Sequence, residues 1–573
     1  MKTKITFLSL VTFFALINLI FSQNLQQLQK LIAPNRLENT NFGISVASND
    51  NYLVVGEYQY SLPGKNYCGV AHIYQKNNLN QWVFMQTIVS NDIAAGDKFG
   101  FSVDISPTNK IIVGAYSNKS VSTNAEGAAY IFELNNQTWI QTAKLNPQQQ
   151  GWVNQFGYSV SIWGNYVVVG APQEYDNGVP KGKIYFFEFN GTNWNLIQST
   201  IPLNTGEYDK VGYKVDVNNN FAVIGNPANN LQKGKVYIYQ KNNISNSWDL
   251  KKSLQPSSLA DMDNFGYALS IDYSTLLNDT LLAVGAYYHD LDSLGNNSLS
   301  NAGAVYVFKC NNNNWDLIQK ITPADRKAND YFGKEVFLKN NKLYIGAEKD
   351  EINVGNEGTA YIYEFNTTLQ KFIQKQEISS SISNTDDLFG TSISANSDYL
   401  FVSAPFHDYD LNNQNPVYNS GAAYIFGVFN PILNISGANL TIADSANSTA
   451  TFDITSNIGW TVATNENWLT VSNTSGSNNA TITLTAQANP TTATRTATVT
   501  VSGNGVSSQI ITVTQSGAAP ILTVSTSALT VNATANSTAT FDITSNIGWT
   551  VATNENWLTV SNTSGSNNAT ITL

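Results

Sequence analysis

The sequence predicts an all-β chain, in which a seven-bladed β-propeller closed by an N-terminal strand is followed by one complete and one truncated immunoglobulin-like β-sandwich. Three observations predict this fold. A Phe-Gly phrase returns seven times within residues 23–429, each copy has the hydrophobic pattern of four short strands, and a different repeat occupies residues 430–573. Periods of a few tens of residues are typical of arrays of small structural units.

The Phe-Gly phrase opens each copy of the first repeat. Successive copies are roughly 55 to 65 residues apart, a spacing typical of units that bury their cores only against one another. The copies open at Phe42, Phe99, Phe156, Val211, Phe265, Phe332 and Phe389, with valine in place of phenylalanine in the fourth copy.

The third copy shows the four predicted strands. Residues 156–162 alternate between apolar and small polar side chains, and residues 166–172 are continuously apolar, as in a strand buried on both faces. Residues 182–189 are rich in aromatic side chains, which favour strands. Asn190-Gly191 is a strong hairpin signal, and the fourth strand begins at Trp194.

The seventh copy lacks a fourth strand, because the composition changes soon after Phe426. The missing strand is expected at the other end of the chain, where residues 28–36 match the pattern of residues 318–326. An open edge strand invites aggregation, and closure of the ring removes that edge. The N-terminal segment is therefore predicted to complete the last blade.

This pattern of Phe-Gly, Gly-Ala-Pro and Gly-x-x-Tyr resembles the FG-GAP repeat of integrin α-subunits and of many bacterial extracellular proteins. The resemblance covers residues 25–429 and implies an extracellular propeller. Integrin-type repeats often carry a calcium loop between the first two strands. The corresponding turns here, residues 104–109, 163–165 and 339–342, lack the necessary ring of oxygen ligands, so calcium at that place is not carried over.

The second repeat has two copies, since residues 446–484 are identical to residues 535–573. Short alternating runs, such as residues 496–501, suit a β-sandwich. The region resembles the BACON domain, for which binding of carbohydrate or mucin has been proposed. We expect one complete domain at residues 430–518 and a truncated one at residues 519–573, which would make the chain a fragment of a longer product.

Composition narrows the location and the partners. Lys2 and Lys4 precede an apolar run, so residues 1–22 are predicted to be a signal peptide that directs the chain to the outside or the outer cell surface. The net charge is −11 without any basic patch, which argues against nucleic acid. No membrane span is expected after signal removal. Cys68 and Cys310 are expected to be buried free thiols rather than a disulfide. The protein is expected to be a monomer.

Any binding site is expected near the central channel, on the face that carries the long loops. An aspartate lies two residues before the Phe-Gly position in five copies. One interpretation is a turn in which the side chain accepts nearby backbone N–H groups. The other is a ring of carboxylates at the channel mouth that collects cations, with some pKa values raised by the like charges. These residues are Asp97, Asp209, Asp263, Asp330 and Asp387.

A second candidate is a pair of Asp-x-Asp sequences in long loops. Asp290 and Asp292 lie in the fifth copy, and Asp408 and Asp410 lie in the seventh. Such spacing can present two carboxylates to Ca²⁺, the one cofactor that the sequence suggests. The alternative is an aspartate-rich surface turn, because two ligands alone do not hold a metal.

A third candidate is aromatic. Side chains on the long-loop face could stack on sugars or anchor a protein, or could pack between blades. In the sandwiches, one tryptophan of each copy is out of phase with the buried positions and is a candidate for an exposed ring. The propeller candidates are Trp152, Tyr175, Tyr287, Tyr288 and Tyr409, and the sandwich candidates are Trp468 and Trp557.

The sequence favours a protein that binds or adheres to an extracellular protein or glycan without catalysis. The propeller would be the recognition head, and the sandwiches would be spacers or weak carbohydrate binders. One alternative is a glycosidase or lyase on the propeller, although the repeats carry no catalytic motif and the histidines are scattered over the blades. Another is an accessory region of a larger enzyme that continues past residue 573.

Overall fold

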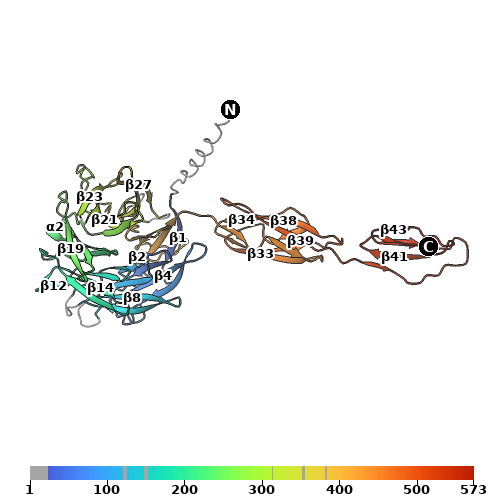
Figure 1. Cartoon of the computed structure of the whole chain (residues 1–573), viewed down its shortest axis with the longest axis horizontal. Helices are drawn as coiled ribbons and strands as arrows, with labels where there is room; N and C mark the ends of the chain where they lie inside the picture. The colour runs from blue at the N-terminus through green and yellow to red at the C-terminus, as the bar shows by residue number, and fades with distance from the viewer. Residues whose placement is uncertain (1–23, 120–125, 148–152, 313, 352–354, 381–383) are drawn as a thin grey trace, which may run out of the picture. The chain divides into compact units, whose positions relative to one another are not determined.

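The computed structural model describes residues 24–573, apart from residues 120–125, 148–152, 313, 352–354 and 381–383 (Figure 1). The predicted signal peptide and Trp152 lie outside the described residues. Strands make up nearly all of the regular structure, and α2 (Asn229–Gln232) is a single turn, so the all-β prediction is confirmed. The chain divides into two compact units, Met1–Phe429 and Asn430–Leu573.

Six four-stranded antiparallel sheets of the first unit are built from strands in chain order. The first is β2 (Val46–Ser48), β3 (Tyr52–Glu57), β4 (Val70–Lys76) and β5 (Trp82–Ile88), and the second is β6 (Ser102–Ile105), β7 (Lys110–Ala115), β8 (Ala128–Asn135) and β9 (Thr138–Leu145). The third is β10 (Ser159–Trp163), β11 (Tyr166–Ala171), β14 (Lys183–Phe189) and β15 (Trp194–Thr200), with a small hairpin of β12 (Tyr175–Asp176) and β13 (Val179–Pro180) between β11 and β14. The fourth is β16 (Lys214–Val217), β17 (Phe221–Asn226), β18 (Lys235–Asn242) and β19 (Ser247–Leu254). The fifth is β20 (Leu269–Ser274), β21 (Asp279–Ala286), β22 (Ala304–Asn311) and β23 (Asn314–Ile321), and the sixth is β24 (Glu335–Lys339), β25 (Lys342–Ala347), β26 (Thr359–Asn366) and β27 (Lys371–Ile378).

The seventh sheet joins the two ends of this unit. It contains β28 (Ile393–Ala395), β29 (Tyr399–Ala404), β30 (Ala422–Gly427) and the N-terminal strand β1 (Gln26–Ile32). β1 pairs antiparallel with β30, with Leu31 opposite Ala423. The N-terminal segment thus takes the place of the missing fourth strand, as the sequence predicts. The first strands of successive sheets contact one another in a closed circle, from β2 through β28 and back to β2.

The Phe-Gly phrase lies where one sheet meets the next. Phe99 of the second sheet is fully buried, and its backbone lies against Gly69, which opens the third strand of the first sheet. A methyl group on Gly69 would lie 2.0 Å from the carbonyl oxygen of Phe99, so a larger residue would push the sheets apart. The same contact between Gly421 and Phe42, also at 2.0 Å, joins the seventh sheet to the first.

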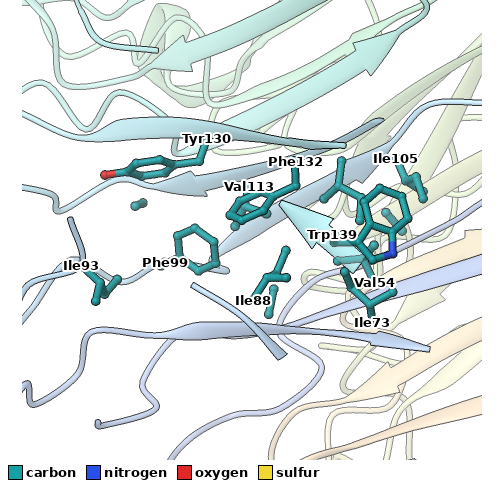
Figure 2. Close-up of a cluster of buried hydrophobic side chains, with 14 of the residues drawn as sticks. Val54, Ile73, Ile88, Ile93, Phe99, Ile105, Val113, Tyr130, Phe132 and Trp139 are labelled. Carbon is teal, nitrogen blue, oxygen red and sulfur yellow. The ribbon is translucent and has the colours of Figure 1, made fainter. Parts of the chain in front are cut away.

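The hydrophobic core lies between neighbouring sheets. Figure 2 shows the cluster between the first two sheets, where Trp139 and Phe132 of the second sheet lie near Val54 and Ile73 of the first. Burying a large apolar side chain contributes roughly 1.5 to 3 kcal/mol to stability, so each interface of this kind stabilises both of its sheets. Cys68 belongs to the same cluster, and Cys310 is buried in the fifth sheet, as predicted.

Polar side chains join the innermost strands of neighbouring sheets. One edge of each innermost strand has no strand partner, and its N–H groups would otherwise lie unpaired against the next sheet. The Ser159 hydroxyl accepts a hydrogen bond of 2.9 Å from the Val215 N–H group. The Ser392 hydroxyl accepts one of 3.0 Å from the Val46 N–H group, which adds a polar contact at ring closure.

Glutamines join the outermost strands in a similar way. The Gln86 side chain donates to the carbonyl oxygen of Trp139 at 2.9 Å and accepts from the Trp139 N–H group at 2.8 Å. One amide thereby replaces the two hydrogen bonds of a β-bridge. The same paired bonds occur at five junctions of the described chain: Gln29 with Trp82, Gln86 with Trp139, Gln198 with Trp248, Gln319 with Phe372, and Gln376 with Leu25.

The second unit begins with two sheets that pack face to face around a shared core, which includes Trp460. One sheet has the order β31 (Leu433–Ile435), β33 (Ser448–Ser456), β37 (Ala480–Ala486) and β35 (Leu469–Val471). The other has the order β32 (Asn439–Ile442), β39 (Gln509–Gln515), β38 (Arg495–Gly503), β34 (Gly459–Thr464) and β36 (Ser475–Ser477). The second copy forms the smaller sheets β40 (Leu522–Val524), β41 (Thr540–Ser545) and β44 (Ala569–Thr572), and β42 (Trp549–Thr550) with β43 (Ser564–Gly565).

The glutamine contacts predict a measurable loss of stability on substitution. Gln86→Ala removes both hydrogen bonds to Trp139 and is expected to lower the free energy of unfolding by roughly 1 to 3 kcal/mol. Urea unfolding followed by tryptophan fluorescence measures the change. Gln75→Ala, on the exposed side of β4, is the matched control and should change stability by less than about 0.5 kcal/mol. Equal effects of the two substitutions would contradict the proposed role of Gln86.

The closing strand predicts a second outcome. A chain that starts at residue 37 lacks β1, exposes the edge of β30, and is expected to be insoluble or to lose cooperative unfolding. The control starts at residue 23 and keeps the strand. Solubility after expression and the thermal unfolding curve compare the two. A soluble shortened chain that unfolds cooperatively would show that β1 is dispensable for closure.

Candidate functional site

The innermost strands surround a central cavity of about 590 Å³, to which all seven sheets contribute. This volume is within the range of small-ligand sites. One end of the cavity lies where the second strands end, so the long connections begin on that face. It is lined by the residues that directly follow the Phe-Gly phrase, namely Ile44, Phe101, Tyr158, Tyr213, Tyr267, Lys334 and Thr391.

Aromatic rings follow one another around this end of the cavity. The ring centroids of Phe101 and Tyr158 are 4.9 Å apart, those of Tyr158 and Tyr213 are 5.0 Å apart, and those of Tyr213 and Tyr267 are 4.9 Å apart. Successive rings are inclined by 48°, 47° and 45°, because equivalent positions in neighbouring sheets are turned about the channel axis. Tyr287 extends the series at 4.5 Å from Tyr267. We call these five residues the aromatic arc.

A charged pair lies at one end of the aromatic arc. The Lys334 ammonium lies 4.7 Å from the ring centroid of Tyr267 and 4.5 Å from that of Tyr287, a cation–π arrangement. The same ammonium is 3.1 Å from a carboxylate oxygen of Glu348, whose other oxygen accepts a hydrogen bond from the Thr391 hydroxyl. The two opposite charges are therefore held together beside the rings.

The tyrosine hydroxyls of the aromatic arc stay protonated. Burial, followed by the neighbouring tyrosines, raises the pKa values of Tyr158 and Tyr213 well above the ordinary value. Burial also raises the pKa of Tyr267. A neutral tyrosine hydroxyl both donates and accepts hydrogen bonds, so this end of the cavity offers ring faces together with neutral polar groups.

Deeper in the cavity, carboxylates help to join the sheets. Asp104 accepts a hydrogen bond of 2.8 Å from the Ile162 N–H group, and Asp216 accepts one of 2.8 Å from the Ile271 N–H group. The Ser161 hydroxyl lies 3.0 Å from Asp104 and 3.1 Å from Asp216, yet it can donate only one proton. Burial is the main cause that raises the pKa of Asp216 to about 7.

A family model described as FG-GAP repeat matches six segments of the chain, which together span more than half of its length. The chain belongs to the FG-GAP repeat family. The matched segments are residues 25–74, 82–132, 139–187, 248–308, 315–363 and 372–426. The first three strands of the fourth sheet, whose phrase begins with Val211, lie outside these segments, but the sheet has the same four-stranded order.

Further comparisons concern the second unit and solved structures. A model described as Viral BACON domain matches residues 433–518 and 521–573. No curated protein matches the chain. Solved structures that match include a Bacteroides ovatus GH5 xyloglucanase in complex with a XXXG heptasaccharide, which is 35% identical over 15% of this chain and 19% of its own, with a TM-score of 0.15. An exo-inulinase from Aspergillus awamori is 10% identical over 86% of this chain and 92% of its own, with a TM-score of 0.30.

The chain spans less than two thirds of the xyloglucanase, and at these TM-scores neither structural likeness carries an argument about fold or function. Within the described residues, no helix combines the length and the apolar character that crossing a bilayer requires.

The FG-GAP propeller brings only some of the predicted aromatic residues together. Tyr287 belongs to the aromatic arc, and Tyr288 lies 4.0 Å from it by ring centroids. Tyr175 lies in the β12–β13 hairpin, and the ring centroid of Tyr409 is 6.1 Å from that of His407. None of these four predicted residues lines the cavity itself, although Tyr287 packs against Tyr267, which does.

Sequence reasoning missed most of the aromatic arc, namely Phe101, Tyr158, Tyr213 and Tyr267. Its signal is present in the sequence, because an aromatic residue directly follows the Phe-Gly position in four consecutive FG-GAP repeats. That position was interpreted as part of an alternating strand. The structure places it just before the innermost strand begins, where its side chain reaches the end of the cavity.

The five aspartates before the FG-GAP phrase do not line the cavity, and the hypothesis of a carboxylate ring at the channel mouth is wrong. Each is at most 4% exposed and accepts a hydrogen bond from the backbone N–H group three residues earlier, for example from Ala94 to Asp97 at 2.8 Å. The turn interpretation therefore fits. The residues are Asp97, Asp209, Asp263, Asp330 and Asp387.

Several of these aspartates also form side-chain contacts with the loop that follows the second strand of the same sheet. Nδ1 of His289 lies 2.7 Å from Asp263, and Nδ1 of His407 lies 2.8 Å from Asp387. Both histidine rings are buried. The aspartates therefore join two connections of one sheet, which explains why a short side chain recurs at this position.

The Asp-x-Asp sequences are engaged with their own loops. Asp292 accepts a hydrogen bond from the Asn296 N–H group at 2.9 Å, and Asp290 accepts one from the Asn301 N–H group at 2.8 Å. Arg326 donates to the Asp290 carbonyl oxygen at 2.6 Å, so a side-chain cation already lies in this loop. Asp408, Asp410 and Arg36 repeat the arrangement in the seventh sheet. Calcium binding here stays a prediction that the geometry does not favour.

Trp468 is not the exposed ring that its phase suggested. It is 9% exposed, and the Arg495 guanidinium lies 4.4 Å from its ring centroid. Trp557 is 71% exposed within an identical sequence segment. The difference arises because β38, which carries Arg495, has no counterpart among residues 535–573. Trp468 is therefore a packing residue, and Trp557 has no counterpart of Arg495 over its ring within the described residues.

The burial of Asp330 predicts a pH-dependent stability. Burial, the largest cause, raises its pKa to about 7, so the folded state disfavours the charged form. The contribution of Asp330 is complete below about pH 4 and declines as the pH rises to 7. Asp330→Asn cannot ionise and is expected to raise the free energy of unfolding at pH 8 by about 1 kcal/mol or more, with little change at pH 4. Urea unfolding at both pH values measures this.

Asn154 occupies the equivalent position in the third sheet, so asparagine fits this turn. Asp387→Asn is the matched control, because it weakens the contact to buried His407 and should destabilise the fold at both pH values. A destabilising effect of Asp330→Asn at pH 8 would contradict the assignment.

Proposed function

We propose that this chain is a secreted or cell-surface protein that binds an extracellular glycan or protein without catalysis. The FG-GAP propeller is the recognition head, and the BACON sandwiches are spacers or weak carbohydrate binders. The aromatic arc carries the proposal, since it gathers five rings from four neighbouring sheets, and four of these rings line one end of the central cavity. Aromatic rings with polar tips supply much of the contact energy in binding sites.

The polar groups of the cavity support binding rather than catalysis. A glycosidase requires two carboxylates that are free to act on the substrate as acid and as base or nucleophile. Asp104 and Asp216 instead accept backbone N–H groups of the next sheet. Glu335 is paired with Lys214 at 2.9 Å. Their removal would disturb the contacts between sheets, which is the expected property of structural groups.

The location rests on the sequence and the families. The basic start and apolar run of residues 1–22 have the composition of a signal peptide. FG-GAP repeats and BACON domains are typical of extracellular proteins, and the matches span residues 25–573 with few interruptions. These observations support export to the outside of the cell.

A binding experiment tests the proposal. The chain from residue 23 is applied to a glycan array and to intact cells that share its environment, and the bound protein is quantified by fluorescence. The double substitution Tyr158→Ala with Tyr213→Ala is expected to reduce binding at least tenfold, because it removes two adjacent rings of the aromatic arc. Tyr273→Ala, which removes an exposed ring from the β20–β21 hairpin, is the matched control and should leave binding unchanged.

Two results would contradict the proposal. Binding that is equally strong in the double variant would place the recognition site elsewhere. Release of shorter products from a bound glycan, detected by mass spectrometry and lost in an Asp104→Asn variant, would show that the propeller is an enzyme.

A further inference from the structure

We propose that the aromatic end of the cavity recognises an uncharged glycan, whose sugar rings stack on the aromatic arc and whose hydroxyls bond to the tyrosine hydroxyls. This inference rests on the proposed function and narrows its ligand class. It follows from how the charges at this end are already paired, and from which rings have no cation over them.

The charges at this end of the cavity cancel. The Lys334 ammonium and the Glu348 carboxylate are 3.1 Å apart, and Thr391 holds the second oxygen of the carboxylate. Deeper in the cavity, Lys214 and Glu335 form another pair at 2.9 Å. An acidic sugar would meet Glu348 next to the Lys334 ammonium, which that carboxylate already engages. Separating such a pair costs more than a new charged contact returns.

A cationic ligand would compete with the protein itself. Ammonium groups favour the faces of aromatic rings, and Lys334 already occupies the faces of Tyr267 and Tyr287. In the described part of the chain, no lysine or arginine lies over Phe101, Tyr158 or Tyr213. The rings without a cation therefore lie away from the charged pair, and they suit the apolar face of a neutral sugar ring.

The hydroxyl groups of the aromatic arc fit the same ligand. Tyr158 and Tyr213 keep their protons, because burial and their tyrosine neighbours raise their pKa values. The hydroxyls of Tyr158, Tyr213 and Tyr267 hydrogen-bond to one another, and each oxygen can still accept a hydrogen bond from a sugar hydroxyl. Sugar hydroxyls also donate and accept, so a neutral glycan can satisfy these groups without leaving a buried polar atom unpaired.

The size of the cavity favours a ligand whose end can enter it, such as an oligosaccharide, over a protein partner that presents a broad surface. About 590 Å³ is in the range of pockets that enclose small ligands, and four rings of the aromatic arc line one end of the cavity. A folded protein partner would contact the rim but leave the cavity unfilled. We therefore infer that one end of an oligosaccharide enters the cavity while the following units lie along the rings.

Calorimetry on the chain from residue 23 tests the inference. The probes are neutral tetrasaccharides (cellotetraose, maltotetraose, mannotetraose and xylotetraose), the acidic tetragalacturonate and the cationic chitosan tetramer. At least one neutral probe is expected to bind, and neither charged probe. Tyr213→Ala should weaken that binding at least tenfold, Tyr213→Phe should weaken it less, and Tyr273→Ala should leave it unchanged.

A charge variant separates the ligand classes. Glu348→Gln leaves Lys334 without its carboxylate partner, so tetragalacturonate should now bind, while the affinity for the neutral probe should change less than about threefold. Urea unfolding of each variant, compared with the wild type, shows whether the fold is retained.

The remaining outcomes overturn the inference in distinguishable ways. If a charged probe binds the wild type and Tyr213→Ala abolishes that binding, the inference is wrong but the proposed recognition site stands. If a neutral probe binds with the same affinity in Tyr213→Ala, both the inference and the proposed recognition site on the propeller are wrong. If no tetrasaccharide binds, the inference is wrong, and loss of cell binding in the Tyr158→Ala and Tyr213→Ala double variant would then point to a protein ligand.

Discussion

The fold depends on a close backbone contact between neighbouring sheets. The glycine that opens the third strand of one sheet lies against the Phe-Gly phrase of the next, and no side chain fits between them, as at Gly69 and Phe99. This contact brings the innermost strands close enough for short serine and aspartate side chains to reach the backbone of the next sheet. It also explains why two separate motifs recur with the same period, since each is half of one interface.

The same contact determines where the candidate site forms. A residue that directly follows the Phe-Gly phrase is carried to the end of the central cavity, because the phrase itself is buried between sheets. Aromatic residues at this position in four consecutive repeats therefore lie side by side. The spacing of the sheets therefore sets the spacing of these rings, without a specialised loop. Variation at one position per repeat can change the ligand without changing the fold.

The sequence was sufficient for the parts of the structure that depend on periodicity. It predicted the four strands of each repeat and the pairing of β1 with β30, because apolar alternation and matching segments report these directly. The sequence did not show in which direction individual side chains point. The recurrent aspartates share a position in the repeat. The repeat period does not show that their side chains are buried within their own sheet rather than pointing toward the channel. Trp468 was misplaced for a related reason, since strand phase does not reveal that Arg495, distant in sequence, covers its ring.

The repeats differ in their polar groups, and the sixth sheet gathers acidic side chains where the second sheet has an ion pair. In the second sheet, the Lys144 ammonium lies 2.6 Å from Asp92. In the sixth sheet the equivalent lysine position holds Glu377, which gathers with Asp325 and Asp350. Burial, followed by these two neighbours, raises the pKa of Glu377. The glycine and phenylalanine contacts are unchanged in this sheet, so the ring tolerates the cost. Since the closed ring distributes stability over seven similar interfaces, one sheet can carry unfavourable charge while the others maintain the shape of the cavity.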